Sequence, residues 1–89
     1  MTIRLSGTLT CNASELETVR SALPEHIRLS RAEPGCLEFE IRESAPGVFN
    51  LSEEFMDQAA FEAHLTRTRA STWWQLTAHM PRNFKVSAT

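Results

Sequence analysis

The sequence has few glycines and no cluster of basic residues. Its three glycines, Gly7, Gly35 and Gly47, lie too far apart for the glycine-rich loops that bind nucleotide phosphates. Nine basic residues stand against 11 acidic ones, giving a formal net charge of −2, and no run of lysine or arginine is present to neutralise phosphates. The sequence therefore excludes dinucleotide and P-loop sites, and it disfavours nucleic acid and anionic membranes as partners.

Long apolar stretches and paired cysteines are also missing. The first residues, Met1 to Gly7, are too polar for a signal peptide, and no segment approaches the roughly 18 apolar residues that span a bilayer. Cys11 and Cys36 form no CxxC pair, and two such cysteines without a secretory signal are typical of a reduced protein. We therefore expect a cytoplasmic protein that uses no membrane.

The composition that remains is that of one small globular domain. Hydrophobic residues make up 42% of the chain and charged residues 22%, which is ordinary for globular proteins. A length of 89 residues corresponds to one domain, residues 1–89. A chain of this size buries roughly 60–65% of its unfolded surface, which is enough for a core.

Two hydrophobic periods alternate along the chain. Apolar residues recur at every second position in residues 3–9, 37–41 and 49–55, which predicts half-buried strands, and at helical spacing in residues 16–27 and 60–68. A short helix over 73–80 and a strand over 84–86 complete the expected order. The short Pro-Gly turn at 45–47 predicts that its two flanking strands form an antiparallel hairpin.

Capping residues and one proline set the expected helix boundaries. Ser14 and Glu17 fit a capping box for the first helix, and Pro24 should kink or restart that helix because proline removes one backbone donor. Asp57 and Ser71 are the expected caps of the second and third helices.

The element order is strand, helix, strand, strand, helix, short helix, strand. This order predicts an α+β fold of the ferredoxin-like βαββαβ type, with a four-stranded antiparallel sheet and its helices on one face. The side chains of Leu37, Phe39, Ile41, Phe49, Leu51 and Phe55 should pack under the helices. The opposite face is polar, so it is either covered by solvent or paired with a second copy of the chain.

One charged residue interrupts the inward-facing apolar side. Glu53 shares the parity of Phe49, Leu51 and Phe55, so its carboxyl group should point toward the helices, where a charge is costly unless it is paired. His64 lies on the inward stripe of the following helix, so the two side chains should approach each other. A carboxyl group beside an imidazole builds either a catalytic base or a structural hydrogen bond.

Other candidate binding residues lie on the last two helices. Trp73 and Trp74 are adjacent and point in different directions, so one should pack in the core while the other covers an edge, or Trp73 lines an apolar pocket. Arg69 lies one turn earlier, where it either meets a phenolate or carboxylate or remains solvated. His26 and His79 are expected at the surface or at helix ends, and no metal-ligand spacing or nucleophile motif is present.

Two segments of the chain resemble the antibiotic biosynthesis monooxygenase domain family, including its quinol monooxygenase-like members. The first segment runs from Glu33-Pro-Gly-Cys to Ile41, and the second runs from Glu53-Glu-Phe to His64-Leu65. These segments match the family's EPGC strand start, its E-x-W/Y/F pattern and its helix with A-x-x-x-x-H.

The resemblance implies both an assembly and a chemistry. It implies a dimeric α+β barrel in which two sheets face each other across their polar sides. It further implies an enzyme that uses molecular oxygen, without a cofactor, on a small activated aromatic such as a quinol or anthrone. His64 would be the base or polar anchor and Glu53 would orient it. The substrate-binding candidates are Phe55, Trp73, Arg69 and Phe39.

Two other functions remain open at this point. Many relatives carry a second histidine where this sequence has Arg69, which leaves room for a non-catalytic dimer that binds a small metabolite. The same base, used without oxygen, would suit an isomerase or processing enzyme for a small carbonyl signalling molecule.

Overall fold

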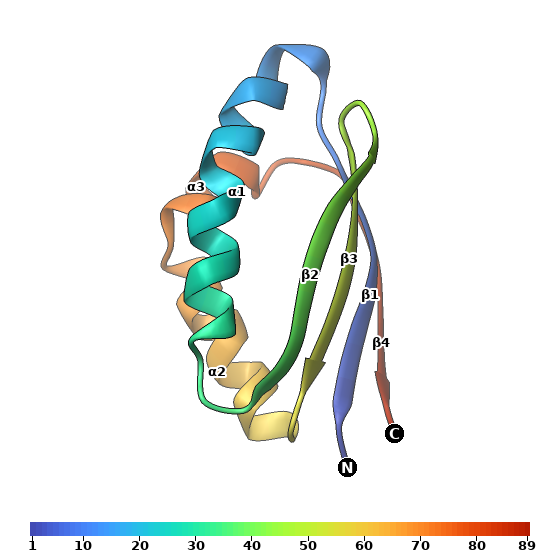
Figure 1. Cartoon of the computed structure of the whole chain (residues 1–89), viewed down its shortest axis with the longest axis vertical. Coiled ribbons are helices and arrows are strands. Elements are labelled where there is room, and N and C mark those ends of the chain that lie inside the picture. The colour runs from blue at the N-terminus through green and yellow to red at the C-terminus, as the bar shows by residue number, and fades with distance from the viewer.

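The computed structural model describes residues 1–89 and forms a sheet covered by helices on one side (Figure 1). The sheet order is β2-β3-β1-β4, and every neighbouring pair of strands is antiparallel. This arrangement confirms the predicted ferredoxin-like α+β fold. In chain order the elements are β1 (Ile3–Thr10), the 3-10 turn η1 (Ala13–Glu15), α1 (Leu16–Arg31), β2 (Cys36–Ala45), β3 (Val48–Phe55), α2 (Gln58–Arg69), α3 (Thr72–Thr77) and β4 (Arg82–Ala88).

Strand β3 organises the core because its side chains alternate strictly between the two faces. Phe49, Leu51 and Phe55 are buried on the helical side, and Glu53 is buried among them with 3% of its surface exposed. The prediction that Glu53 points toward the helices is thus confirmed. Val19 from α1 and Trp73 from α3 complete the core from the helical side.

The start of β2 differs from the expected alternation. A β-bulge between Cys36 and Glu38 places two residues of β2 opposite one residue of β3. The side chains at the start of β2 therefore point to the opposite face of the sheet from the one that the alternation predicts. Leu37, predicted to pack under the helices, is therefore 57% exposed, while Cys36 packs against the core. Phe39 and Ile41, beyond the bulge, are buried as predicted.

Helix α1 runs unbroken through Pro24, so it does not restart there. Val19 and Ser30, on either side of the proline, are both fully buried. The capping box at Ser14 is not formed, since Asn12 caps the preceding turn by accepting a hydrogen bond from the Glu15 amide.

The later helix boundaries follow their sequence signals more closely. Asp57 accepts a hydrogen bond from the Ala60 amide at 2.8 Å, and Ser71 accepts one from the Trp74 amide, so both predicted caps are confirmed. Helix α3 ends at Thr77, three residues before the expected end at Met80. None of the three helices has the length and apolar character needed to cross a membrane.

The polar face of the sheet, which no helix covers, carries its own hydrogen-bond network. Arg4 pairs with Glu38 at 3.1 Å and with Glu54 at 3.4 Å. Ser52 donates to Glu38 at 2.6 Å and accepts from Arg4 at 2.9 Å. These groups are satisfied within one chain, so the face is compatible with solvent as well as with a second polar surface.

Candidate functional site

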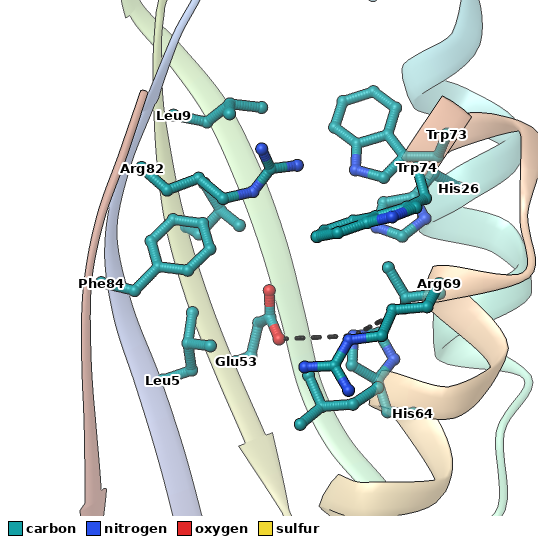
Figure 2. A pocket seen from close by; sticks show the side chains of 13 residues that line it. Leu5, Leu9, His26, Glu53, His64, Arg69, Trp73, Trp74, Arg82 and Phe84 are labelled. Carbon is teal, nitrogen blue, oxygen red and sulfur yellow. Dashed lines mark hydrogen bonds and ion pairs between the residues drawn. The ribbon is translucent and has the colours of Figure 1, made fainter. Parts of the chain in front are cut away.

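A cavity of about 220 Å³ lies between the sheet and helices α2 and α3 (Figure 2). Four of the predicted site residues, Glu53, His64, Arg69 and Trp73, line this cavity. The remaining lining residues are Leu5, Leu9, His26, Leu51, Leu65, Thr68, Trp74, Arg82 and Phe84. The walls are mostly apolar with a few polar groups facing inward, which is the usual character of a small-molecule site.

A tight turn before β2 positions a second carboxylate, that of Glu33, beside His64. Gly35 has a φ of +87°, and a Cβ at this position would lie 2.7 Å from the Cβ of Ala60. Only glycine permits so close an approach in that backbone conformation. The turn therefore rests directly on the first part of α2, and it places Glu33 beside His64 and Arg67.

His64 is held from behind by Glu33. Its Nδ1 lies 2.7 Å from Glu33 Oε1, and the other carboxylate oxygen of Glu33 accepts a hydrogen bond from Arg67 Nε. Arg67 in turn donates to Ser30 Oγ at 2.9 Å. Because Arg67 also holds the Glu33 carboxylate, that group acts as the acceptor and Nδ1 of His64 carries the proton.

This arrangement leaves the Nε2 lone pair of His64 facing the cavity. Burial of the ring lowers the pKa of His64 from its ordinary value of 6.5, while the hydrogen bond to Glu33 opposes part of that shift. The imidazole is thus neutral at pH 7 and able to accept a proton at Nε2. The Thr68 hydroxyl, which also lines the cavity, lies 3.3 Å from Nε2 and donates a long hydrogen bond to it.

Glu53 faces His64 across the cavity as a neutral acid. Its Oε1 lies 3.6 Å from His64 Nε2 (Figure 2), and that oxygen has no hydrogen-bond partner in the chain. Burial, reinforced by the negative charge of Glu33, raises the pKa of Glu53 to about 8. With both groups uncharged at pH 7, the contact is not an ion pair but a neutral base beside a neutral acid.

The sequence matches one known protein family. Residues 2–75 match the sequence profile of the family described as antibiotic biosynthesis monooxygenase. The chain belongs to the antibiotic biosynthesis monooxygenase family. A search of curated proteins finds no match.

Solved structures of low sequence identity share the fold of this family member. Rv0793 from Mycobacterium tuberculosis is 23% identical over 100% of this chain and 95% of its own, with a TM-score of 0.79. A Nitrosomonas europaea protein that bears the family name is 24% identical over 99% of this chain and 89% of its own, with a TM-score of 0.86. A Deinococcus radiodurans protein that bears the same name is 25% identical over 100% and 92%, with a TM-score of 0.79.

Two candidate substrate-binding residues of this family member do not line the cavity. Phe55 and Phe39 are buried beneath His64, with ring centroids 4.9 Å and 5.4 Å from that of His64. Both rings therefore pack against the imidazole and lie behind the cavity wall. Trp73 and Trp74 both line the cavity, and Trp73 is the more deeply buried of the two.

The expectation that His26 lies at the surface or at a helix end is wrong, because it lies inside α1. His26 is only 5% exposed, and its ring stacks on Trp73 with a centroid distance of 4.7 Å and an angle of 6°. Burial and nearby positive groups lower the pKa of His26 to about 3, so it is neutral, and its Nδ1 has no partner. His79 is exposed as expected and contacts Glu15 at 2.5 Å.

The sequence did not predict the residues that form hydrogen bonds behind His64, or the cavity residues that come from β4. Glu33 belongs to a motif that the sequence displays, yet its distance of 31 positions from His64 hides the contact. Arg67 and Arg82 carry no pattern that separates them from surface arginines. No group of three or more histidine, cysteine, aspartate or glutamate side chains is arranged to hold a metal ion.

Proposed function

We propose that this family member is a monooxygenase that oxidises a small activated aromatic, such as a quinol or anthrone, with molecular oxygen and no cofactor. The observation that carries the proposal is the orientation of His64. The Glu33 carboxylate, itself bound by Arg67, accepts a hydrogen bond from Nδ1 of His64. The unprotonated Nε2 therefore faces a small, largely apolar cavity. The family match supports a monooxygenase-like activity in general.

The proposed reaction begins with a proton transfer to His64. The substrate O–H, or the acidic C–H of an anthrone, gives its proton to Nε2, and the resulting imidazolium is stabilised by Glu33. The electron-rich substrate anion then passes one electron to oxygen, and the radical pair combines to form a C–O bond and a peroxide. When the O–O bond breaks, one oxygen atom remains in the product and the other leaves as water. The substrate itself supplies both hydrogens of that water, so no external reductant is consumed.

The other cavity residues suit the same reaction. The neutral carboxyl group of Glu53 can donate a hydrogen bond to the developing oxyanion or peroxide. Trp73, held in place by its stack on His26, offers a flat wall to an aromatic ring. The apolar walls exclude water, which protects the substrate anion from reprotonation by solvent.

Oxygen labelling tests this proposal directly. The metal-free protein is incubated with a panel of quinols and anthrones under ¹⁸O₂, and we expect oxygen uptake above the autoxidation background with one ¹⁸O atom in each product molecule. Product that carries no ¹⁸O, or hydrogen peroxide formed in place of labelled product, would contradict a monooxygenase.

Glu33 is proposed as a positioning residue for His64. In Glu33→Gln the neutral amide stabilises the imidazolium less, so we expect the pKa of His64 to fall further and kcat/KM to fall roughly 10–100-fold. The pKa of the ring is followed by NMR titration. Glu25→Gln, which removes an exposed partner of Arg28, is the matched control. An unchanged His64 pKa in Glu33→Gln would assign Glu33 a purely structural role.

We also propose that the chain works as a cytoplasmic homodimer, with the polar sheet faces of two copies opposed. Both cysteines are free thiols, which suits a reducing compartment. Sedimentation at micromolar concentration should give twice the mass of one chain. Ser6→Arg, on the polar face of β1, should produce a monomer, whereas Ser21→Arg, on the exposed side of α1, should not. A monomeric wild type would refute the dimer.

A second activity is favoured by one specific contact. The neutral acid Glu53 lies 3.6 Å from the neutral base His64, and such a pair can move a proton between two atoms of a small carbonyl compound. This isomerase would turn over without oxygen. Turnover that persists under argon would support the isomerase. Turnover that stops under argon would favour the monooxygenase.

A further inference from the structure

Arginines in this chain divide into two groups according to their partners. All but two form an ion pair with a carboxylate of the same chain, and the paired residues are Arg4, Arg20, Arg28, Arg31, Arg42 and Arg67. The two without a carboxylate, Arg69 and Arg82, both line the cavity. The unpaired guanidinium groups of the protein are therefore concentrated at this site.

Arg82 is fixed in place by neutral groups. Its guanidinium donates to the main-chain oxygens of Thr77 and Met80 and to the Thr77 hydroxyl, and it lies 5.0 Å from the ring centroid of Trp74. These contacts orient the group but leave its charge uncompensated. Partial burial of an uncompensated guanidinium costs free energy that an anion in the cavity would offset.

Arg69 approaches the same space from the opposite side. Figure 2 shows its side chain extending from α2 toward the sheet, while Arg82 extends from β4 toward the helices. Arg69 is exposed and makes no hydrogen bond or ion pair within the chain. The only carboxyl group that lines the cavity with these two arginines is Glu53, which is neutral at pH 7.

We propose that the ligand of this site is an acidic aromatic compound, whose hydroxyl or acidic carbon reaches His64 and whose carboxylate, or equivalent anionic substituent, is bound by Arg69 and Arg82. This inference rests on the proposed function, because it takes the cavity as the aromatic-binding site. A cavity of roughly 150 Å³ accommodates benzene, so about 220 Å³ suits a ring system somewhat larger than benzene. A guanidinium pair recognises a carboxylate through charge-assisted hydrogen bonds.

The test compares two probes that differ only in charge. 6-Hydroxy-2-naphthoate carries a carboxylate at the end opposite its hydroxyl, and 6-hydroxy-2-naphthamide has nearly the same shape without the charge. Binding is measured by calorimetry on the wild-type protein. We expect the acid to bind at least about tenfold more tightly than the amide, as charge-assisted hydrogen bonds imply.

Three variants test which residues cause a preference for the acid over the amide. Arg69→Gln and Arg82→Gln should each lower the acid-to-amide affinity ratio roughly five- to tenfold. Arg42→Gln removes one positive charge from β2, outside the cavity lining, and should leave the ratio unchanged. Arg69 has no partner in the chain, so its variant tests the proposal even if Arg82→Gln is unstable.

Four results would overturn the inference. They are equal affinity for the two probes, no binding of either probe, an Arg42→Gln effect as large as that of Arg69→Gln, and an Arg69→Gln variant that dissociates the dimer without changing the ratio. The last result would mean that a second copy supplies the missing carboxylate. A preference for the acid in a protein that consumes no oxygen would retain this inference while removing the monooxygenase proposal, so the two fail separately.

Discussion

Replacing His64 with alanine is expected to lower kcat/KM for a quinol or anthrone by roughly 10²–10⁴-fold, the usual contribution of a positioned general base. The reason is geometric, because no other cavity group is a neutral base held by a carboxylate. Glu53 is protonated at pH 7, and the ring of His26 is occupied by its stack on Trp73. Turnover is measured as initial oxygen uptake, corrected for autoxidation.

Two further variants make this experiment specific. His64→Gln retains much of the packing against Phe39 and Phe55 but removes the base, so it should be as inactive as His64→Ala. His79→Ala removes an exposed histidine that contacts only Glu15, and it should retain wild-type activity. If His64→Ala turns over every accepted substrate at the wild-type rate, the base has been assigned to the wrong residue.

Replacing Glu53 with glutamine is expected to stabilise the protein at alkaline pH relative to wild type. The folded state raises the pKa of Glu53 from 4.5 to about 8, so folding favours the protonated form. The stability that this group contributes is fully present below pH 4.5 and is lost as the pH rises through 8. Since one pKa unit corresponds to about 1.4 kcal/mol, the loss is roughly 3–5 kcal/mol.

Urea unfolding at pH 5 and pH 9 measures this effect as a difference between proteins. The free energy of unfolding of Glu53→Gln minus that of wild type should be higher at pH 9 than at pH 5 by that amount. Glu54→Gln makes the same chemical change one residue away, on the half-buried polar face, and should show no comparable difference. Parallel pH profiles for Glu53→Gln and wild type would show that Glu53 is ionised in the folded protein at neutral pH.

The sequence predicts those features that follow from local periodicity. The alternation in β3 places Glu53 inside, helical spacing in α2 places His64 on the same side, and the hairpin turn joins β2 to β3. These positions require only knowledge of which face of an element is apolar. The fold class and the approach of Glu53 to His64 can therefore be predicted from the amino-acid pattern alone.

The features that the sequence does not predict depend on contacts between distant segments. The bulge at Leu37 reverses a strand face through pairing with β3, which no local pattern records. The Glu33–His64 contact depends on how closely the turn at Gly35 rests on α2. A polar residue such as His26 is expected at the surface, but its ring is buried by stacking on Trp73.

The close contact between Gly35 and Ala60 bears on how this scaffold can be redesigned. The turn at 33–35 lies outside the cavity lining, so it would look like a safe place for insertions or randomisation. Any side chain at position 35 would collide with α2, and relief of that collision would move Glu33 away from His64. Libraries aimed at a new substrate range are therefore best confined to the cavity rim, at Arg69, Trp74 and Phe84, with the turn left unchanged because it positions Glu33 against His64.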